Sequence, residues 1–185
     1  MTGIDLFVLA ALVGAMSKKR RDDQTPTEVP TQPRLPRPPS GQRLPTSGAG
    51  AFGAHRETHS HNGIDLAAPR GRAVYAPADG IVMHAVSTWR QGFSGYGRSV
   101  VLRHSDGRYT LYAHLDSVTV DKGQRVPVGT VIGTVGNSTF TKDNPTKESG
   151  GTHLHFEVSP TPYPQPNTTP RINPVTWLGD KGKIL

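Results

Sequence analysis

The clearest chemical signal in the chain is a pair of histidines two residues apart, His153 and His155, in an alternating segment at residues 152–158. Successive side chains of a strand point to opposite faces, so this segment separates a polar face from an apolar one: His153, His155 and Glu157 against Leu154, Phe156 and Val158. Strand rise places the two imidazoles about 7 Å apart. They can therefore share one catalytic centre without both binding the same metal ion.

A second pair of candidate ligands, His61 and Asp65, lies four residues apart. In an extended chain their side chains would be about 13 Å apart, but Gly63 permits a bend that brings them together. One carboxylate and two imidazoles around an open position form the ligand set of a catalytic zinc ion. Structural zinc usually takes thiolates, and the chain has no cysteine. His59 forms a second His-x-His pair with His61 and stays an alternative ligand.

Short motifs extend this pattern over residues 52–178. In chain order they are His-Asn-Gly-Ile-Asp-Leu-Ala-Ala-Pro from His61, Tyr-Ala-Pro-Ala-Asp-Gly-Ile-Val from Tyr75, Gly-Tyr-Gly from Gly95, Tyr-Ala-His-Leu from Tyr112 and His-Leu-His-Phe-Glu-Val from His153. Together they resemble the M23 family of zinc metallopeptidases, the lysostaphin/LytM-type peptidoglycan endopeptidases.

The resemblance implies a role for five side chains. By it, His61, Asp65 and His155 are expected to bind one Zn²⁺ ion, and His114 and His153 are expected to be the catalytic histidines beside it. The implied activity is hydrolysis of peptide bonds in bacterial peptidoglycan, in cross-links or in stem peptides. The alternative is a non-catalytic regulatory or structural module with the same fold. Such a module would be expected to lack some of these residues, and all are present.

The spacing of apolar residues and glycines predicts an all-β domain. Short strands are expected between glycine-containing turns, at residues 73–77, 80–86, 98–104, 108–115, 126–128, 131–135 and 153–158. No segment shows a helical period over more than two turns. We therefore expect a compact antiparallel sheet with a barrel-like or sandwich core, as the M23 resemblance also implies. Asn-Pro and Trp177 near the end are expected to pack on this core.

Composition divides the 185 residues into three parts. Residues 1–21 hold an apolar segment and a basic cluster, and residues 22–50 form a proline-rich linker. Residues 51–180 form the peptidase-like domain. Two loops, at residues 87–94 and 137–151, adjoin the motifs and are expected to wall a substrate groove. Residues 141–149 resemble an insertion relative to the family, so the sequence does not predict which bond is cut.

The N-terminal apolar segment, residues 4–16, is shorter than the roughly 20 residues that span a bilayer. Its basic cluster follows the apolar run, whereas a secretory signal carries its positive charge first. Three interpretations remain: a short membrane anchor through residues 4–21, an unusual signal peptide, or a helix packed on a partner protein. The order of charges favours a phage, virion-associated or lysis protein that acts in the cell wall or periplasm.

The chain carries a net charge of +7. Residues 17–50 contribute +4 of it, with seven basic and three acidic side chains. This excess suits an anionic partner such as lipid head groups, teichoic acid or the carboxylates of peptidoglycan. No motif combines basic and aromatic residues in the way typical of nucleic-acid binding, so no nucleic-acid partner is expected.

Overall fold

The computed structural model describes residues 44–57, 59–88, 95–140, 144, 147–165 and 169–180. The apolar segment and basic cluster of residues 1–21 lie outside this part, as does almost all of the proline-rich linker. The same holds for residues 89–94 of the first loop and for most of the insertion at residues 141–149.

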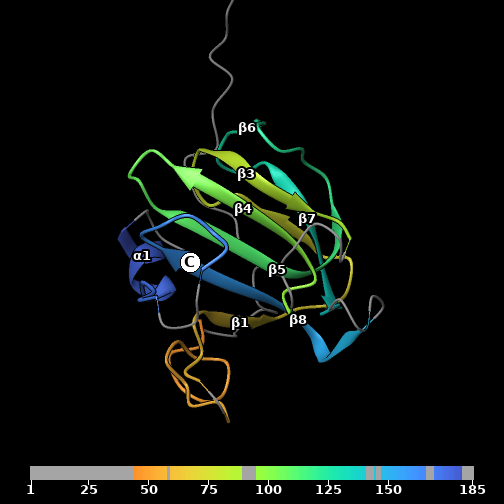
Figure 1. The fold of residues 1–185 in the computed structure, drawn as a ribbon, viewed down its shortest axis with the longest axis vertical. Coiled ribbons are helices and arrows are strands. Elements are labelled where there is room, and N and C mark those ends of the chain that lie inside the picture. Colours follow the sequence, from red (N-terminus) through yellow and green to blue (C-terminus); the bar gives the residue numbers. More distant parts are fainter. Residues whose placement is uncertain are drawn as a thin grey trace, which may run out of the picture.

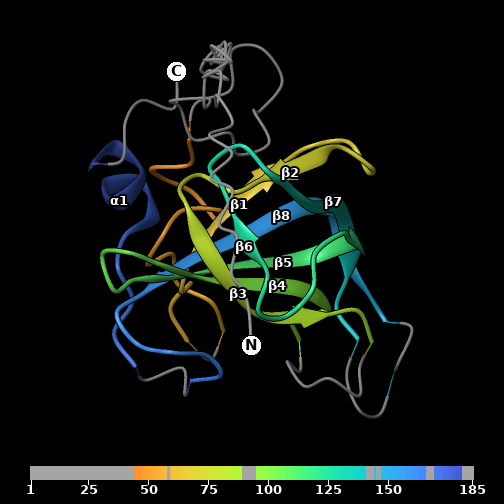
Figure 2. The same ribbon diagram turned by 90° about the horizontal axis from the view of Figure 1, so that it is seen from above.

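In the described part of the chain, an eight-stranded antiparallel sheet carries the fold, and one short helix packs beside it (Figure 1). The strands are paired in the order β1-β8-β7-β5-β4-β3-β6, with β2 added beside β7 and a further pairing between β5 and β8. Their bounds are β1 (Ile64–Ala67), β2 (Ala73–Tyr75), β3 (Gly80–Val86), β4 (Arg98–His104), β5 (Tyr109–Val118), β6 (Arg125–Val126), β7 (Val131–Ser138) and β8 (Glu148–Ser159). Figure 2, turned by 90°, shows how strongly this sheet twists and curves.

The apolar face of β8 forms the centre of the core, as its alternation predicts. Leu154, Phe156 and Val158 are all fully buried. The ring of Phe156 packs against Tyr112 of β5 and Trp177 of the helix. Each large apolar side chain buried in this way contributes about 1.5–3 kcal/mol to stability. The polar face of β8 is also covered near its end, because Glu157 on that face is only 1% exposed.

The prediction of an all-β antiparallel domain is confirmed, although two strands differ from the expected set. The expected strands at residues 80–86 and 98–104 are β3 and β4. Strand β1 was not predicted, because its alternation of buried and more exposed residues extends over only four positions. Strand β8 begins at Glu148, within the expected insertion, because pairing with β7 holds this polar segment extended.

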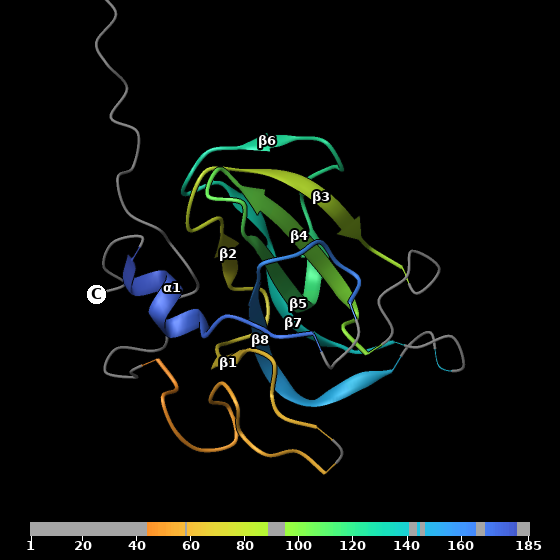
Figure 3. The same ribbon diagram turned by 60° about the vertical axis from the view of Figure 1, so that its left-hand side comes forward.

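Helix α1 (Pro174–Asp180) was also not predicted, since its seven residues make too few turns to show a helical period. Its start follows standard capping chemistry. The side chain of Asn173 accepts a hydrogen bond from the Val175 backbone amide at 3.0 Å, and Pro174 stands at the first helical position. The helix lies beside β8 (Figure 3) and buries Trp177, which confirms the expected packing of that residue on the core.

Gly97 brings the start of β4 against Ser138 at the end of β7. Its φ of 64° lies in the left-handed region, and an added Cβ would collide with the Ser138 carbonyl group. Ser138 joins three strands, because its hydroxyl accepts from the Arg98 amide at 2.9 Å and donates to the Leu115 carbonyl at 2.7 Å. The missing side chain at Gly97 is therefore a condition for this junction.

We predict that Gly97→Ala destabilises the domain by about 3–5 kcal/mol, because steric overlap with Ser138 adds to the backbone strain. Gly95→Ala is the matched control. Gly95 also has a positive φ, 84°, but a Cβ there would meet no neighbour, so only the strain of about 1–2 kcal/mol remains. Urea unfolding of both variants measures the difference, and equal destabilisation would contradict the steric argument.

Candidate metal centre

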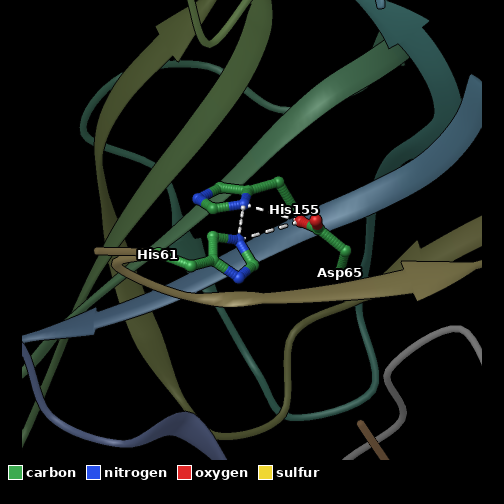
Figure 4. Close-up of side chains that lie close together, drawn as sticks. All are labelled: His61, Asp65 and His155. Carbon is green, nitrogen blue, oxygen red and sulfur yellow. Dashed lines mark hydrogen bonds and ion pairs between the residues drawn. The ribbon is translucent and has the colours of Figure 1, made fainter. Parts of the chain in front are cut away.

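Three predicted ligands converge on one point between β1 and β8 (Figure 4). The pairing of β1 with β8 sets Asp65 directly opposite His155. The Asp65 Oδ1 atom lies 2.9 Å from His155 Nδ1 and 3.2 Å from His61 Nε2, and the two nitrogens are 3.1 Å apart. Gly63 allows this approach, because a Cβ there would collide with the Phe156 carbonyl oxygen. The bend expected between His61 and Asp65 is therefore present.

The outer hydrogen bonds of the two histidines select their tautomers. His61 Nδ1 lies 2.8 Å from the Ala51 carbonyl oxygen, which can only accept, so Nδ1 carries the proton and Nε2 faces the centre with a lone pair. His155 Nε2 donates in the same way to the Glu157 carboxylate at 3.0 Å, which leaves His155 Nδ1 as the inward atom. Such outer partners orient metal-binding imidazoles in proteins.

The ionisation of the cluster favours a bound cation. Burial alone would raise the pKa of Asp65, but hydrogen bonds with His155 and His61 hold that pKa well below its usual range. With both histidines neutral, three lone pairs face one another across about 3 Å, and only a positively charged species can satisfy them together. The donor set of two nitrogens and one carboxylate oxygen fits a divalent zinc ion.

The raised pKa of His155 also indicates that the cluster stabilises a positive charge. Burial lowers this pKa, but the hydrogen bonds to Asp65 and Glu157 and the charges of both carboxylates outweigh burial and raise it to about 9. In the absence of a metal, a proton on His155 thus compensates the buried carboxylates. A divalent cation at the same place would replace that proton.

The two further histidines of the sequence prediction stand beside these ligands. The ring of His114 lies 4.8 Å from the ring of His153 and 5.7 Å from that of His155, measured between centroids. His114 Nδ1 donates to the Ser138 carbonyl oxygen at 2.9 Å, and His153 Nδ1 donates to the Gly151 carbonyl oxygen at 3.0 Å. All five predicted side chains therefore meet at one site.

His114 has an unusual backbone. Its φ is 60°, and it is the one described residue other than glycine with a positive φ. The register of β5 shifts next to it, against both β4 and β7, so the residue sits at an irregularity of the strand. Strain of this kind costs about 1–3 kcal/mol and clusters at functional sites. Here it accompanies the placement of an imidazole beside the candidate metal ligands.

An open cavity of about 290 Å³ exposes the site to solvent. Its walls include all five predicted residues together with Arg56 and His59. Arg56 Nη2 donates to Asp65 Oδ2 at 2.9 Å, so the second carboxylate oxygen is held away from the cluster. His59 lines the cavity, but it does not belong to the group of three converging ligand atoms.

Glu157 has a larger role than sequence reasoning gave it. Its buried carboxylate accepts from four donors: His155 Nε2 at 3.0 Å, Tyr96 Oη at 2.8 Å, Tyr163 Oη at 2.9 Å and Arg171 Nε at 3.0 Å. Burial would raise the pKa of Glu157, but the hydrogen bonds and the charge of His155, with those from Arg171 and Tyr96, lower it to about 2. The carboxylate is therefore ionised and can fix the tautomer of His155.

Tyr163 and Arg171 belong to this site but were missed in the sequence. They come from the proline-rich loop that follows β8, where no periodic pattern marks inward-facing residues. One signal was available. A glutamate in the middle of a buried strand requires a cationic partner, and Arg171 is the arginine that follows it in the chain.

The chain belongs to Peptidase family M23, whose family model matches residues 59–170. It is 43% identical over 98 residues to the "DD-carboxypeptidase/endopeptidase Mpg" of Neisseria meningitidis, covering 53% of this chain and 20% of that protein. It is 35% identical over 123 residues to the "Murein hydrolase activator NlpD" of Escherichia coli, covering 65% of this chain and 28% of that protein. The chain thus spans less than a third of the length of these curated relatives.

Solved structures of peptidases have the same fold. The catalytic domain of the antimicrobial peptidase lysostaphin from Staphylococcus simulans superposes with a TM-score of 0.55 at 26% identity, covering 72% of this chain and 90% of that one. A zinc containing peptidase from Vibrio cholerae gives a TM-score of 0.51 at 30% identity, covering 69% of this chain and 36% of that one. The predicted family is therefore confirmed by sequence and by fold.

We predict that the chelator-treated protein binds one Zn²⁺ per chain. Binding at about 100 times Kd stabilises a protein by about 2.7 kcal/mol, which corresponds to a rise in Tm of about 5–10 °C for a chain of this size. Asp65→Asn should lose this rise, because it removes the ligand charge and keeps the shape. His55→Ala, at an exposed histidine, should keep it. Thermal unfolding with and without zinc measures the change in Tm for each variant. If zinc raised the Tm of Asp65→Asn as much as that of the wild type, the assignment of Asp65 as a ligand would be contradicted.

We also predict that Arg171→Met lowers zinc affinity about 10–100-fold, because Glu157 loses its charged partner and no longer holds His155 firmly. Arg70→Met is the matched control, since Arg70 is exposed and pairs with Asp116 instead. Competition with a chromophoric chelator measures both affinities. Equal affinities in the two variants would show that Arg171 acts on stability alone.

Proposed function

We propose that the protein is a zinc-dependent endopeptidase that hydrolyses peptide bonds in bacterial peptidoglycan. The observation that carries the proposal is the meeting of three inward-facing ligand atoms with two further imidazoles in one open cavity. Membership of the M23 family supports peptidase activity, and the relatives Mpg and NlpD direct the proposal to peptidoglycan.

The chain's own residues suit general acid–base catalysis. When bound, Zn²⁺ would supply Lewis acidity, which polarises a carbonyl group and acidifies water. Burial and the neighbouring imidazoles of His155 and His153 lower the pKa of His114 to about 4, so His114 is neutral near pH 7. Because His114 Nδ1 carries the proton donated to Ser138, His114 Nε2 is the atom that can accept a proton from a nucleophilic water.

His153 is suited to a complementary role. Its Nδ1 proton is held by the Gly151 carbonyl group, and its Nε2 atom lies 3.8 Å from Asp65 Oδ1. Its side chain is 22% exposed, so a substrate can reach it from the cavity. With its ring next to that of His114, His153 can, as the imidazolium, donate a hydrogen bond from Nε2 to the oxygen that gains negative charge during peptide hydrolysis, while Nδ1 keeps its bond to Gly151.

A second function, regulation of another wall hydrolase without catalysis, is favoured by one observation. NlpD, which is 35% identical over the matched region, is named as a murein hydrolase activator. The presence of all five site residues favours catalysis instead. The two functions separate in a simple assay, because a pure activator releases no peptide from purified peptidoglycan until a second hydrolase is added.

We place this activity in residues 51–180 and locate it at the cell wall or in the periplasm. None of the helices in the described part of the chain is long and apolar enough to cross a membrane. Anchoring through residues 4–21 and association with a virion rest on the sequence alone. A deletion of residues 1–50 tests the domain boundary, and full activity of the remaining chain is the expected result.

We predict that His114→Ala lowers the rate of peptide release from purified peptidoglycan about 10²–10⁴-fold while zinc stoichiometry stays at one. The reason is that His114 supplies the proton acceptor and none of the three ligand atoms. His84→Ala, at a half-buried histidine of β3 outside the cavity, is the control and should keep full activity. Unchanged hydrolysis by His114→Ala would overturn its catalytic assignment.

A further inference from the structure

A second and larger cavity, of about 600 Å³, lies along strands β3, β4 and β6. Strands β1 and β6 stand at opposite ends of the sheet order (Figure 1). The cleft therefore lies toward the opposite edge of the sheet from β1, the strand that carries Asp65. None of the five residues at the metal centre lines the cleft. Its main lining residues are Ile81, Arg103, His104, Arg125, Val126 and Pro127.

Two arginines stand side by side over this cleft. Ile81 of β3 pairs with Arg103 on one side and with Arg125 on the other. Directly paired residues of antiparallel strands point to the same face, so both guanidinium groups flank the Ile81 side chain. With strands about 4.8 Å apart, the two arginine Cα atoms are about 10 Å apart, a distance that two long side chains can close around one ligand.

Both guanidinium groups are exposed, and neither forms an ion pair or hydrogen bond within the described part of the chain. The nearby carboxylates are engaged elsewhere. Asp79 accepts from the Val128 amide at 2.7 Å. Asp106 accepts from the Arg108 amide at 3.0 Å and from Trp177 Nε1 at 3.1 Å. Asp79 also lines the cleft, so the cleft offers two guanidinium groups against one carboxylate.

Besides the polar residues Asp79 and Ser105, the rest of the cleft is apolar or rigid. Ile81 and Pro127 supply aliphatic surface, and Val126 is buried behind them. His104 is held at both nitrogens, by the Asp79 carbonyl oxygen and by the Thr110 hydroxyl group, each at 2.8 Å, and its ring packs on Trp177. A complementary ligand would combine carboxylate groups with small aliphatic groups, because guanidinium binds carboxylate with charge-assisted, bidentate hydrogen bonds.

We propose that this cleft binds the stem-peptide carboxylates of a second stretch of peptidoglycan and holds the domain on the polymer while the metal centre acts. The identity of the polymer rests on the proposed function. Stem peptides carry free carboxylates next to alanine side chains, which match the two arginines and the aliphatic floor. The chain's own residues 17–50 are a poor occupant, since their seven basic and three acidic side chains give a net charge of +4, which the two arginines repel. Two linked contacts retain an enzyme on a polymer better than one.

The test is cosedimentation of the full chain, in the presence of chelator, with purified peptidoglycan from which phosphate-containing polymers have been removed. The variant Arg103→Gln/Arg125→Gln should bind about tenfold or more weakly, because it loses two charge-assisted contacts. The control variant Arg70→Gln/Lys147→Gln removes the same charge at exposed positions outside the cleft and should bind like the wild type. Equal binding of the two variants would overturn the proposal.

Two further experiments identify which chemical groups of the polymer the cleft binds. Amidation of the peptidoglycan carboxylates should abolish the difference between wild type and the cleft variant. A difference that appears only when phosphate-containing polymers are retained would overturn the assignment to carboxylates. Hydrolysis of a short soluble stem peptide, measured with zinc, should be unchanged in the cleft variant. If the wild type hydrolyses nothing but the binding difference persists, the proposed function fails while the cleft assignment stands.

Discussion

The position of one imidazole, that of His155, supports the whole site. Its Nδ1 atom points to Asp65 at 2.9 Å, and its Nε2 atom donates to Glu157 at 3.0 Å. The first contact depends on the register between β1 and β8, and the second joins two residues of β8 that share one face of the strand, one of them the buried Glu157. A slip of one residue between β1 and β8 would turn the ring away from Asp65. The geometry of the candidate metal centre is therefore a consequence of strand register.

The buried carboxylate of Glu157 places a demand on the rest of the domain. An ionised group that is 1% exposed is tolerated only when it is fully hydrogen-bonded and compensated in charge. The loop after β8 meets this demand by returning Tyr163 and Arg171 to the interior, and the bridge between Val158 and Ile172 holds its end against the strand. A segment with the composition of a surface loop thus forms part of the support of the candidate metal centre.

The sequence predicts most of the polar centre because its ligands lie in locally patterned segments. His153 and His155 alternate with core residues, and Gly63 marks the bend between His61 and Asp65. The parts that escaped prediction depend on tertiary contacts. Strand β1 alternates over only four residues, too few for the pattern to stand out, and the start of β8 is extended only because β7 pairs with it. The arginine pair of β4 and β6 is likewise invisible in the sequence, since Arg103 and Arg125 become neighbours only through Ile81.

The left-handed backbone at His114 has a genetic consequence. Asparagine tolerates this conformation better than most residues, and a histidine codon becomes an asparagine codon by a change of one base. Such a mutation would remove the imidazole and leave the chain path and the three inward ligand atoms intact. Within this architecture, the proposed hydrolase and a variant that lacks its proton acceptor but keeps its ligand atoms are separated by a single nucleotide.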